Sequence, residues 1–544
     1  MKRAFVLFAL CIACRAQAEP REMVAAAHPL AVEAGLAVLR DGGSAIDAAV
    51  AVQMVLGVVE PQASGIGGGG FLLYYDGGTR AITAYAGRET APAGATPTMF
   101  LGADGKPLPF GKAVASGMSV GVPGAVVLLE LAHREHGRLP WAGLFKSAIA
   151  IAREGYSVSP RLAAWLRTIK LFAKEPAARA TYYNQDGSPK KESERVVNPA
   201  LADTMRLIAA RGSAVLREGP IAEEIVKRVH SHVRPGTLSV DDLASYKPIE
   251  RKALCGPYRL WIVCGMPPPS SGGVAILQVL GLLEPFDLWR EKPNSVRSLH
   301  LIAEASRLAF ADRAHYLADP AFVDVPVAKL LAPAYIAERR KLISADHAMS
   351  KEKPVAAGYV EHGTSHMTIV DRWGNAVSFT TTIEAPFGAE MMVGGFILNN
   401  ELTDFSAEPE RNGQPVANRV QPGKRPRSSM SPTFVLNQDG RLLLAVGSAG
   451  GARIIGDTLQ ALIGMLDWNL SAQAALDLPR VINMNGPTEL EDRGDLPAKA
   501  DALRALGHEV QVRRHDGGLA AIRRAGDGWD GAADPRRDGV AKGG

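Results

Sequence analysis

Threonine hydroxyls in two consecutive strand-like segments are the groups best placed for chemistry. Residues 364–370 and 376–383 both alternate in strand fashion and are joined by a five-residue turn. Pairing the residues on either side of that turn places Thr364 opposite Thr382, hydroxyl to hydroxyl. Thr364 also directly follows Gly363. We therefore predict that Thr364 is a nucleophile and that the chain is cut just before it.

Two further segments offer hydrogen-bond donors to an anionic group. Gly450 and Gly451 precede a predicted helix at residues 454–468, and glycine N–H groups at a helix N-terminus suit an oxyanion. A plain tight turn explains the two glycines equally well. Ser428 and Ser429 lie in a basic loop and offer hydroxyl and amide donors to a carboxylate. Taken alone, such a loop is more often simply solvated.

Several motif matches are misleading. Residues 65–70 fit G-x-G-x-x-G but follow a helix and precede a strand, the reverse of a dinucleotide site. We expect these glycines to let main chain approach another segment closely. Residues 117–121 fit G-x-S-x-G without a good preceding strand. The 12 histidines include no H-E-x-x-H, and the C-x-x-C at residues 11–14 falls in the N-terminal segment, so we predict no metal and no cofactor.

The elements around these residues alternate between covering helices and antiparallel strands, which predicts an α+β fold with sheets covered by helices. A Pro-initiated helix, a Ser44-capped helix and a Gly-rich hairpin come first. The elements expected are helices at residues 30–40, 125–136, 274–283 and 295–316, and strands at 70–75, 80–86, 395–398, 433–436 and 441–446.

The N-terminus reads as a secretory signal peptide at residues 1–18. Lys2 and Arg3 precede an apolar run at residues 4–13, and small residues follow at positions suited to cleavage. A buried helix or lipid attachment at Cys14 fits the pattern less well. No other apolar run is long enough to span a bilayer, so the mature form is expected to have no membrane span and to be periplasmic or extracellular.

Composition narrows the partners. The chain has 544 residues, 47% hydrophobic and 22% charged, as in an ordinary soluble globular protein. The net charge of +5 is small for this length and the basic residues are scattered, so we expect no nucleic-acid partner. After signal removal only Cys255 and Cys264 remain. These two either form one disulfide or stay as two buried thiols.

The motifs together resemble the γ-glutamyltransferase (glutathione hydrolase) precursors of the N-terminal-nucleophile hydrolase superfamily. The resemblance spans residues 23–540. The matching motifs lie at residues 61–69 (PQASGIGGG), 87–92 (GRETAP), 266–273 (MPPPSSGG), 364–371 (TSHMTIVD), 399–406 (NNELTDFS), 427–432 (RSSMSP), 447–453 (GSAGGAR) and 534–536 (DPR).

This resemblance implies a four-layer αββα sandwich and self-cleavage between Gly363 and Thr364. A large subunit at residues 19–363 and a small subunit at 364–544 would then form one domain. The freed amine of Thr364, with an ordinary pKa near ~8, would serve as the base for its own hydroxyl.

The resemblance also implies a reaction and a site. Glutathione or a related γ-glutamyl amide would acylate Thr364, and water, an amino acid or a dipeptide would accept the acyl group. The implied roles are positioning of the nucleophile by Thr382, oxyanion binding by Gly450 and Gly451, binding of the substrate α-carboxylate by Arg88, Ser428 and Ser429, and binding of its α-ammonium by Glu401 and Asp404.

Two departures from the family pattern bear on the substrate. Glu384 stands where well-characterised members carry Asn, so three carboxyl groups would surround one ammonium, and we predict a raised pKa for one of Glu384, Glu401 and Asp404. Residues 406–421 lack the aromatic residue that closes a lid in some members. A paralogous acylase acting on glutaryl- or cephalosporin-type amides is therefore the alternative. A non-catalytic γ-glutamyl-binding paralogue fits less well.

Overall fold

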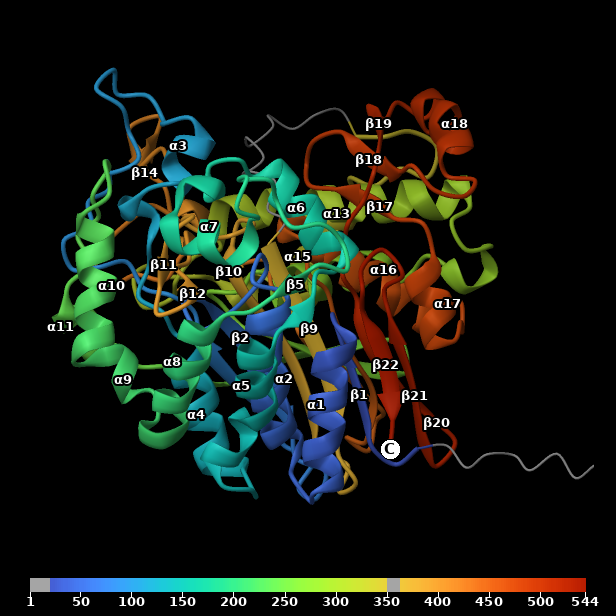
Figure 1. Ribbon diagram of the computed structural model, residues 1–544. Coiled ribbons are helices and arrows are strands. Elements are labelled where there is room, and N and C mark those ends of the chain that lie inside the picture. Colours follow the sequence, from blue (N-terminus) through green and yellow to red (C-terminus); the bar gives the residue numbers. More distant parts are fainter. Residues whose placement is uncertain (1–19, 350–362) are drawn as a thin grey trace, which may run out of the picture.

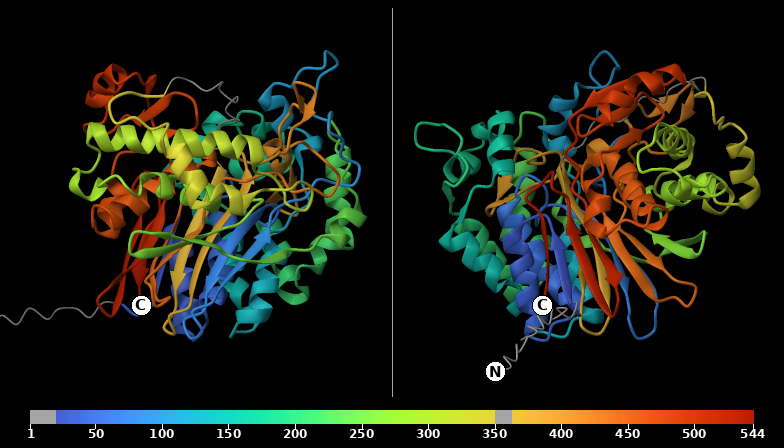
Figure 2. Two further views of the ribbon diagram at one scale, coloured as in Figure 1. Left: turned by 180° about the vertical axis from the view of Figure 1, so that it is seen from behind. Right: turned by 90° about the vertical axis from the view of Figure 1, so that its right-hand side faces the viewer.

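Two antiparallel β-sheets pack face to face at the centre of the molecule (Figures 1 and 2). The structure is a computed structural model, and it describes residues 20–349 and 363–544. The predicted signal peptide lies outside these residues. None of the helices in the two described ranges is both long and apolar enough to cross a membrane.

The first sheet has seven strands, with β9 and β10 near its middle. These two strands form the predicted threonine hairpin, and every pairing in the sheet is antiparallel. In spatial order its strands are β22 (Val540–Gly543), β1 (Met23–Ala26), β9 (Gly363–Val370), β10 (Ala376–Glu384), β2 (Gly69–Tyr75), β3 (Ile82–Gly87) and β6 (Ile249–Lys252).

The second sheet has six strands, also all antiparallel. Its central strand β16 leads directly into the predicted oxyanion glycines. In spatial order its strands are β21 (Gly528–Ala533), β20 (Ala520–Ala525), β16 (Leu442–Gly447), β15 (Thr433–Leu436), β8 (Trp261–Gly265) and β7 (Leu254–Tyr258).

Helices cover the outer face of each sheet, as the right-hand view of Figure 2 shows. The first sheet is covered by α1 (Pro29–Arg40), α2 (Ala45–Val59), α4 (Ala125–His136), α5 (Lys146–Glu154) and α8 (Pro199–Arg211). The second is covered by α12 (Gly272–Leu283), α13 (Val296–Tyr316) and α16 (Ile454–Leu466).

Shorter elements complete the described chain. The remaining helices are α3 (Phe110–Val114), α6 (Pro160–Thr168), α7 (Pro176–Tyr182), α9 (Ala214–Arg217), α10 (Pro220–His230), α11 (Val240–Ser245), α14 (Val327–Leu330), α15 (Pro333–Arg340), α17 (Ala472–Asp477) and α18 (Ala500–Ala505). The remaining strands are β4 (Tyr156–Ser157), β5 (Arg195–Val196), β11 (Met392–Val393), β12 (Phe396–Ile397), β13 (Glu410–Arg411), β14 (Gln414–Pro415), β17 (Val481–Asn483), β18 (Thr488–Glu491) and β19 (Val510–Arg513).

Three apolar layers account for the four-layer architecture. Alternation along β2 sends Phe71 toward the second sheet, where it packs in one cluster with Phe434 of β15. Leu72 points the other way, into the cluster that contains α2. A third cluster joins Val446 of β16 to Leu280 of α12. The molecule is therefore an α+β protein with αββα layers, as predicted.

Local signals in the sequence explain the first elements. Pro29 occupies the first turn of α1, where its missing N–H costs nothing. Ser44 and Asp47 form a reciprocal capping box at the start of α2. Both features match the prediction.

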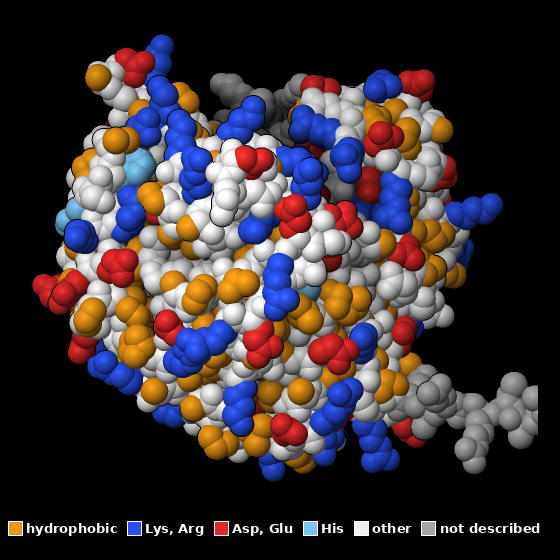
Figure 3. All heavy atoms as spheres, in the orientation of Figure 1, with side chains coloured by type: hydrophobic (Ala, Val, Ile, Leu, Met, Phe, Trp, Pro, Cys, Tyr) orange, Lys and Arg blue, Asp and Glu red, His pale blue; other side chains and the backbone are white. Residues whose placement is uncertain are grey.

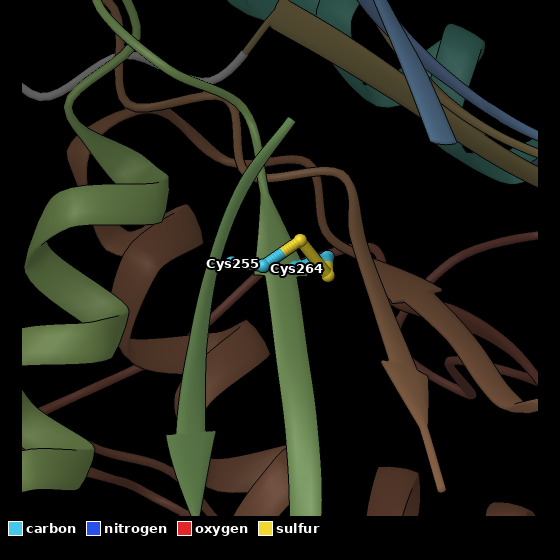
Figure 4. Close-up of a disulfide and its surroundings, with 2 residues drawn as sticks. All are labelled: Cys255 and Cys264. Atoms are coloured by element: carbon cyan, nitrogen blue, oxygen red, sulfur yellow. A yellow bond between two sulfur atoms is a disulfide. The ribbon is translucent and has the colours of Figure 1, made fainter. Parts of the chain in front are cut away.

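A disulfide joins Cys255 of β7 to Cys264 of β8, which lie opposite each other in the ladder (Figure 4). The bridge lies inside one hairpin at the edge of the second sheet. Of the two states that the sequence left open, the structure has the bridged one.

Strands from both sides of the Gly363–Thr364 bond alternate within the first sheet. β1 precedes this bond in sequence, yet it lies between β22 and β9, the latter of which carries the bond itself. β10 pairs in turn with β2 from the earlier part of the chain. The two parts of the chain thus share one hydrogen-bonded sheet.

Candidate active site

Thr364 and Thr382 face each other across the β9–β10 ladder, in the register predicted from the sequence. Their hydroxyl oxygens are 3.3 Å apart. The Thr382 hydroxyl donates to the carbonyl oxygen of Gly363, and its oxygen accepts the main-chain N–H of Glu384 at 2.8 Å. Because the proton of Thr382 is already committed to Gly363, the Thr364 hydroxyl is the donor to Thr382.

Gly363 sits in a space that admits no side chain. A Cβ at this position would lie 2.5 Å from the carbonyl oxygen of Glu384. The ladder is irregular here, because the register shifts between Thr382 and Glu384. The bulge and the missing side chain together let the bond before Thr364 lie close to the Thr382 hydroxyl.

The glycine run at residues 65–70 has the role expected for it. A Cβ on Gly68 would overlap the carbonyl oxygen of Thr382, and one on Gly67 would overlap the main chain at Ile397. The Gly67 carbonyl accepts the main-chain N–H of Asn399 at 3.2 Å. These glycines therefore allow the loop after Leu398 to lie beside the end of β10.

The loop that carries Gly450 and Gly451 follows β16 on the side faced by Thr364. His366, two residues after Thr364, packs so closely on Gly447 that a side chain there would overlap its ring. Gly450 and Gly451 have φ of +134° and +66°, a region that favours glycine. The loop leads into a short 3-10 turn and then α16, so its N–H groups lie at the start of a helix.

A buried contact between Asp457 and His515 holds the loop of Gly450 and Gly451 in place. The Ser448 hydroxyl donates to the carboxylate of Asp457 at 3.1 Å, and His515 lies 2.8 Å from the same carboxylate. Burial alone raises the pKa of Asp457, but His515 and nearby arginines outweigh it and lower the pKa overall. Asp457 is therefore a stable anion that anchors the loop.

Arg88 organises the predicted ammonium pocket. Its buried guanidinium forms ion pairs with Glu401 and Asp404. It also donates to the carbonyl oxygens of Pro426 and Arg427, both at 3.1 Å. Burial lowers the pKa of Arg88, but the two carboxylates raise it overall, so the guanidinium stays charged. Arg88 thus joins the turn Glu401–Asp404, called the acidic turn below, to the loop that leads to Ser428.

Ser428 and Ser429 lie where two segments that are distant in sequence contact each other. The main-chain N–H of Ser428 donates to the Pro269 carbonyl at 3.0 Å. Arg313 of α13 donates to the Ser429 hydroxyl oxygen at 2.6 Å and to that of Ser271 at 2.8 Å. Since Arg313 occupies a lone pair of Ser429, the Ser429 hydroxyl proton remains available to a carboxylate.

Glu384 is buried and turned toward the loop after β12. The Asn400 side-chain amide and the Thr403 hydroxyl both donate to its carboxyl, the latter at 3.3 Å. Burial, followed by the charges of Asp404 and Glu401, raises the pKa of Glu384 well above its ordinary value. The surroundings of the Glu384 carboxyl therefore favour its neutral form more strongly than water does.

Two further carboxyl groups in this cluster have raised pKa values. Burial raises the pKa of Glu401 well above its ordinary value against the opposing effect of Arg88. Burial likewise raises the pKa of Glu89, the neighbour of Arg88, to about 8. This is the direction predicted for closely spaced carboxyl groups. A cluster with one buried cation and several carboxyl groups accommodates an added ammonium.

Comparison with known proteins agrees with this geometry. The family model described as Gamma-glutamyltranspeptidase matches residues 31–544. The chain belongs to the γ-glutamyltranspeptidase family. It is 39% identical to the glutathione hydrolase proenzyme of Bacillus subtilis (strain 168), covering 96% of this chain and 91% of that protein.

Acylases are also similar to this γ-glutamyltranspeptidase family member. The acylase ACY 1 proenzyme of Pseudomonas sp. (strain SE83) is 38% identical, covering 96% of this chain and 93% of the acylase. The crystal structure of cephalosporin acylase from Bacillus halodurans superposes with a TM-score of 0.85 at 30% identity, covering 96% of each chain. Both kinds of relative match almost the whole length of this chain in sequence.

Four site residues of this family member are absent from the sequence-based prediction. Glu89 and Asn400 lie inside matching motifs, directly beside Arg88 and Glu401, so adjacency is a usable signal. Arg537, which donates to the carbonyl oxygen of Thr364 at 2.7 Å, directly follows the last motif. Arg313 carries no such signal, because it is one of many basic residues on helices.

Proposed function

We propose that this chain is a self-cleaving γ-glutamyl hydrolase and transferase acting on glutathione and related γ-glutamyl amides. The observation that carries the proposal is the position of Thr382 at the Gly363–Thr364 bond. Its hydroxyl donates to the carbonyl of Gly363 and lies 3.3 Å from the hydroxyl of Thr364. One residue thus polarises the bond to be cut and orients the group that cuts it.

Self-cleavage is an acyl shift followed by hydrolysis. The Thr364 Oγ attacks the carbonyl carbon of Gly363 and the C–N bond breaks. The leaving Thr364 nitrogen takes up the proton that the hydroxyl loses and becomes a free amine. Water then hydrolyses the resulting ester, leaving a carboxylate on Gly363 and a free Thr364 hydroxyl. The products are a large subunit at residues 19–363 and a small subunit at 364–544.

Turnover reuses the same hydroxyl. The Thr364 amine takes the hydroxyl proton while Oγ attacks the γ-carbonyl of the donor, and the main-chain N–H groups of Gly450 and Gly451 stabilise the oxyanion. The leaving amine takes the proton and departs, leaving a γ-glutamyl ester on Thr364. Water, an amino acid or a dipeptide then attacks this ester and regenerates the enzyme.

Recognition of the γ-glutamyl group divides between two sets of side chains. Ser428 and Ser429 donate to the α-carboxylate, and Arg313 polarises Ser429. Glu401 and Asp404 accept the α-ammonium, and Arg88 holds both in place through its ion pairs while adding positive charge beside the α-carboxylate.

The surface charge supports an anionic substrate. Lys and Arg side chains gather across the upper part of the face in Figure 3, over α6 and α7 and beside β18 and β19. They include the exposed Arg167, Lys170 and Lys174. Arg161 of α6 pairs with Glu60, which accepts the hydroxyl of Ser365, so α6 lies near the nucleophile. This positive field attracts γ-glutamyl compounds, which carry excess carboxylate.

A second function is favoured by one feature of the pocket. The raised pKa of Glu384 leaves a neutral carboxyl that can donate a hydrogen bond. An acyl group that carries a carboxylate but no ammonium, such as glutaryl, suits such a donor. Acylase relatives that cover almost the whole chain support this alternative.

A denaturing gel tests the nucleophile. The purified chain is expected to give two fragments, and mass spectrometry should find Thr364 at the N-terminus of the smaller one. Thr364→Ala should remain one inactive chain. Cutting of this variant at Gly363 would exclude Thr364 as the nucleophile.

Paired anilides separate the two functions. γ-Glutamyl and glutaryl 4-nitroanilides differ only in the α-ammonium, which Glu401 and Asp404 are proposed to bind. The γ-glutamyl compound is expected to have the larger kcat/KM, and Asp404→Asn should reduce this preference. A preference of the wild type for glutaryl anilide would favour the acylase function.

The proposal includes export to the periplasm or the outside of the cell. Its support is the basic and apolar pattern of residues 1–18 and the disulfide, which persists in oxidising compartments. Fractionation of expressing cells, with N-terminal sequencing of the large fragment, tests it. Retention of Met1 in the mature protein would contradict export through this segment.

A further inference from the structure

Arg537 lies against the main chain of the nucleophile. Its guanidinium donates to the carbonyl oxygen of Thr364 at 2.7 Å and to that of Asp516 at 2.9 Å. Arg537 follows β21 in the sequence, and this residue is only 8% exposed. A Cβ on Gly518 would lie 2.6 Å from the Arg537 side chain, so this side chain packs directly against Gly518. Its position is therefore fixed on several sides.

One nitrogen of this guanidinium has no hydrogen-bond partner among residues 20–349 and 363–544. Nη2 of Arg537 is buried and makes no hydrogen bond within the described residues. It lies 4.0 Å from the position that a Cβ on Gly450 would take. An unpaired buried N–H group destabilises the fold, so its position between Thr364 and the oxyanion loop calls for a functional reason.

Charged groups surround Arg537 from several elements. Arg161 of α6 adds positive charge, while Glu60 at the end of α2, Asp516 and Asp534 add negative charge. Glu60 is already occupied, because it pairs with Arg161 at 3.2 Å and accepts the Ser365 hydroxyl at 3.0 Å. Burial, followed by Arg161, lowers the pKa of Arg537 to about 10, which still leaves it charged at neutral pH.

A fixed cation at this point acts on the amine that self-cleavage exposes. The amine and the carbonyl of Thr364 are attached to the same Cα, so the guanidinium lies within a few ångströms of the new N-terminus. A like charge this close disfavours protonation of an amine. Only the neutral amine can accept the Thr364 hydroxyl proton.

We propose that Arg537 is a positioning residue for the N-terminal nucleophile: it fixes the Thr364 carbonyl and keeps the freed α-amine in its neutral, proton-accepting form. This inference rests on the proposed function, because it requires the cut before Thr364. It adds a role outside the catalytic and substrate-binding residues predicted from the sequence.

Titration of the wild-type amine is the first test. Cyanate carbamylates only neutral amines, and mass spectrometry of the small fragment across a pH series gives the pKa of its N-terminus. We expect a value about one pH unit below the ordinary ~8. A value at or above 8 would overturn the inference. A small fragment that does not begin at Thr364 would instead contradict the proposed function.

Variants supply the second test. Arg537→Met removes the charge at similar length, Arg537→Lys keeps it, and Arg228→Met removes an arginine that pairs with Glu175 away from the site. The acidic limb of the pH profile of kcat/KM on γ-glutamyl anilide reports the pKa of the Thr364 amine. For Arg537→Met, this limb should move upward by about one pH unit. Arg537→Lys should restore the limb, and Arg228→Met should match the wild type.

The acidic limb of the pH profile of kcat/KM distinguishes this role from a purely structural one. A lower kcat for Arg537→Met with an unmoved acidic limb would mean that Arg537 only supports the fold, and would overturn the inference. If Arg537→Met stays uncut, the wild-type amine titration and the limb of Arg537→Lys decide, since both need only processed enzyme. The acidic limb of Arg537→Lys should stay close to that of the wild type. If it moves upward by as much as is expected for loss of the charge, that would also count against the inference.

Discussion

The side-chain amide of Asn400 donates to the carboxyl of Glu384, and both groups are fully enclosed. This contact holds the Glu384 carboxyl against the loop after β12, the same loop that carries Glu401 and Asp404. Together with the Thr403 hydroxyl it supplies two donors, yet burial still raises the pKa of Glu384. The surroundings of Glu384 therefore favour its protonated form.

Glu384→Gln should change how stability depends on pH. An unfolded Glu ionises near pH ~4.3, whereas the folded Glu384 stays protonated to higher pH. The folded wild type therefore loses about 1.4 kcal/mol relative to the unfolded chain for each pH unit above ~4.3, until its own pKa is reached. The Gln variant lacks this loss.

Thermal unfolding of both proteins from pH 4 to pH 8 checks this. The Tm of Glu384→Gln should rise relative to the wild type as pH increases, while Glu338→Gln, at an exposed surface pair, should follow the wild type. Parallel curves for the wild type and Glu384→Gln would show that Glu384 ionises normally.

Thr382→Val should slow self-cleavage by about 100-fold, because it removes the hydroxyl that donates to the Gly363 carbonyl. It should also cost about 1–3 kcal/mol of stability, since the buried N–H of Glu384 loses its acceptor. A time course on denaturing gels measures the first effect and thermal unfolding the second. Thr382→Ser keeps the hydroxyl and should cut almost normally; equal rates for Val and Thr would exclude this role.

Gly363→Ala should prevent efficient cutting although it leaves every catalytic group in place. The added Cβ would meet main-chain atoms of Glu384 and Ala385, which cannot rotate away as a side chain can. Gly486→Ala is the matched control, because nothing lies within 4 Å of its Cβ position. Gel analysis of fresh protein should show intact Gly363→Ala and fully cut Gly486→Ala. Normal cutting of both would mean that the bulge adapts.

Replacing Cys255 and Cys264 together with Ser should lower stability without changing kcat. The bridge closes a short loop, for which chain entropy gives an upper bound of about 2–3 kcal/mol. The β7–β8 hairpin lies at an edge of the second sheet. Urea unfolding with and without reductant measures the loss. A drop in kcat at unchanged fold would connect this edge to the site.

Local patterns in the sequence predict the central hairpin and most helices. Thr364 and Thr382 can be paired on paper because a short turn fixes their register. Strands β1 and β22 escape prediction, since each has four residues and gains its stability from partners far away in sequence. The contact of Arg537 with Thr364 likewise joins residues that lie far apart in sequence, so local patterns do not predict it.

The electrostatics of the pocket are only partly predictable. Glu384 two residues after Thr382, together with Glu401 and Asp404 in one matching motif, is enough to expect a raised pKa, because like charges oppose ionisation. Which carboxyl groups are affected depends on burial and on donors such as Asn400, and neither can be read from one sequence. The ion pairs of Arg88 with both acidic residues of the turn are likewise a product of packing.

The position of β1 between β9 and β22 has a consequence for synthesis. A ribosome makes β1 long before either neighbour, so this strand waits without hydrogen-bonding partners until the later segments emerge. A chain released early lacks β22 and Arg537, and its Thr364 would not be held in the same way. If the chain is cut as proposed, the cut would follow the docking of β22 and Arg537, because these hold β1 and Thr364 in the positions described above.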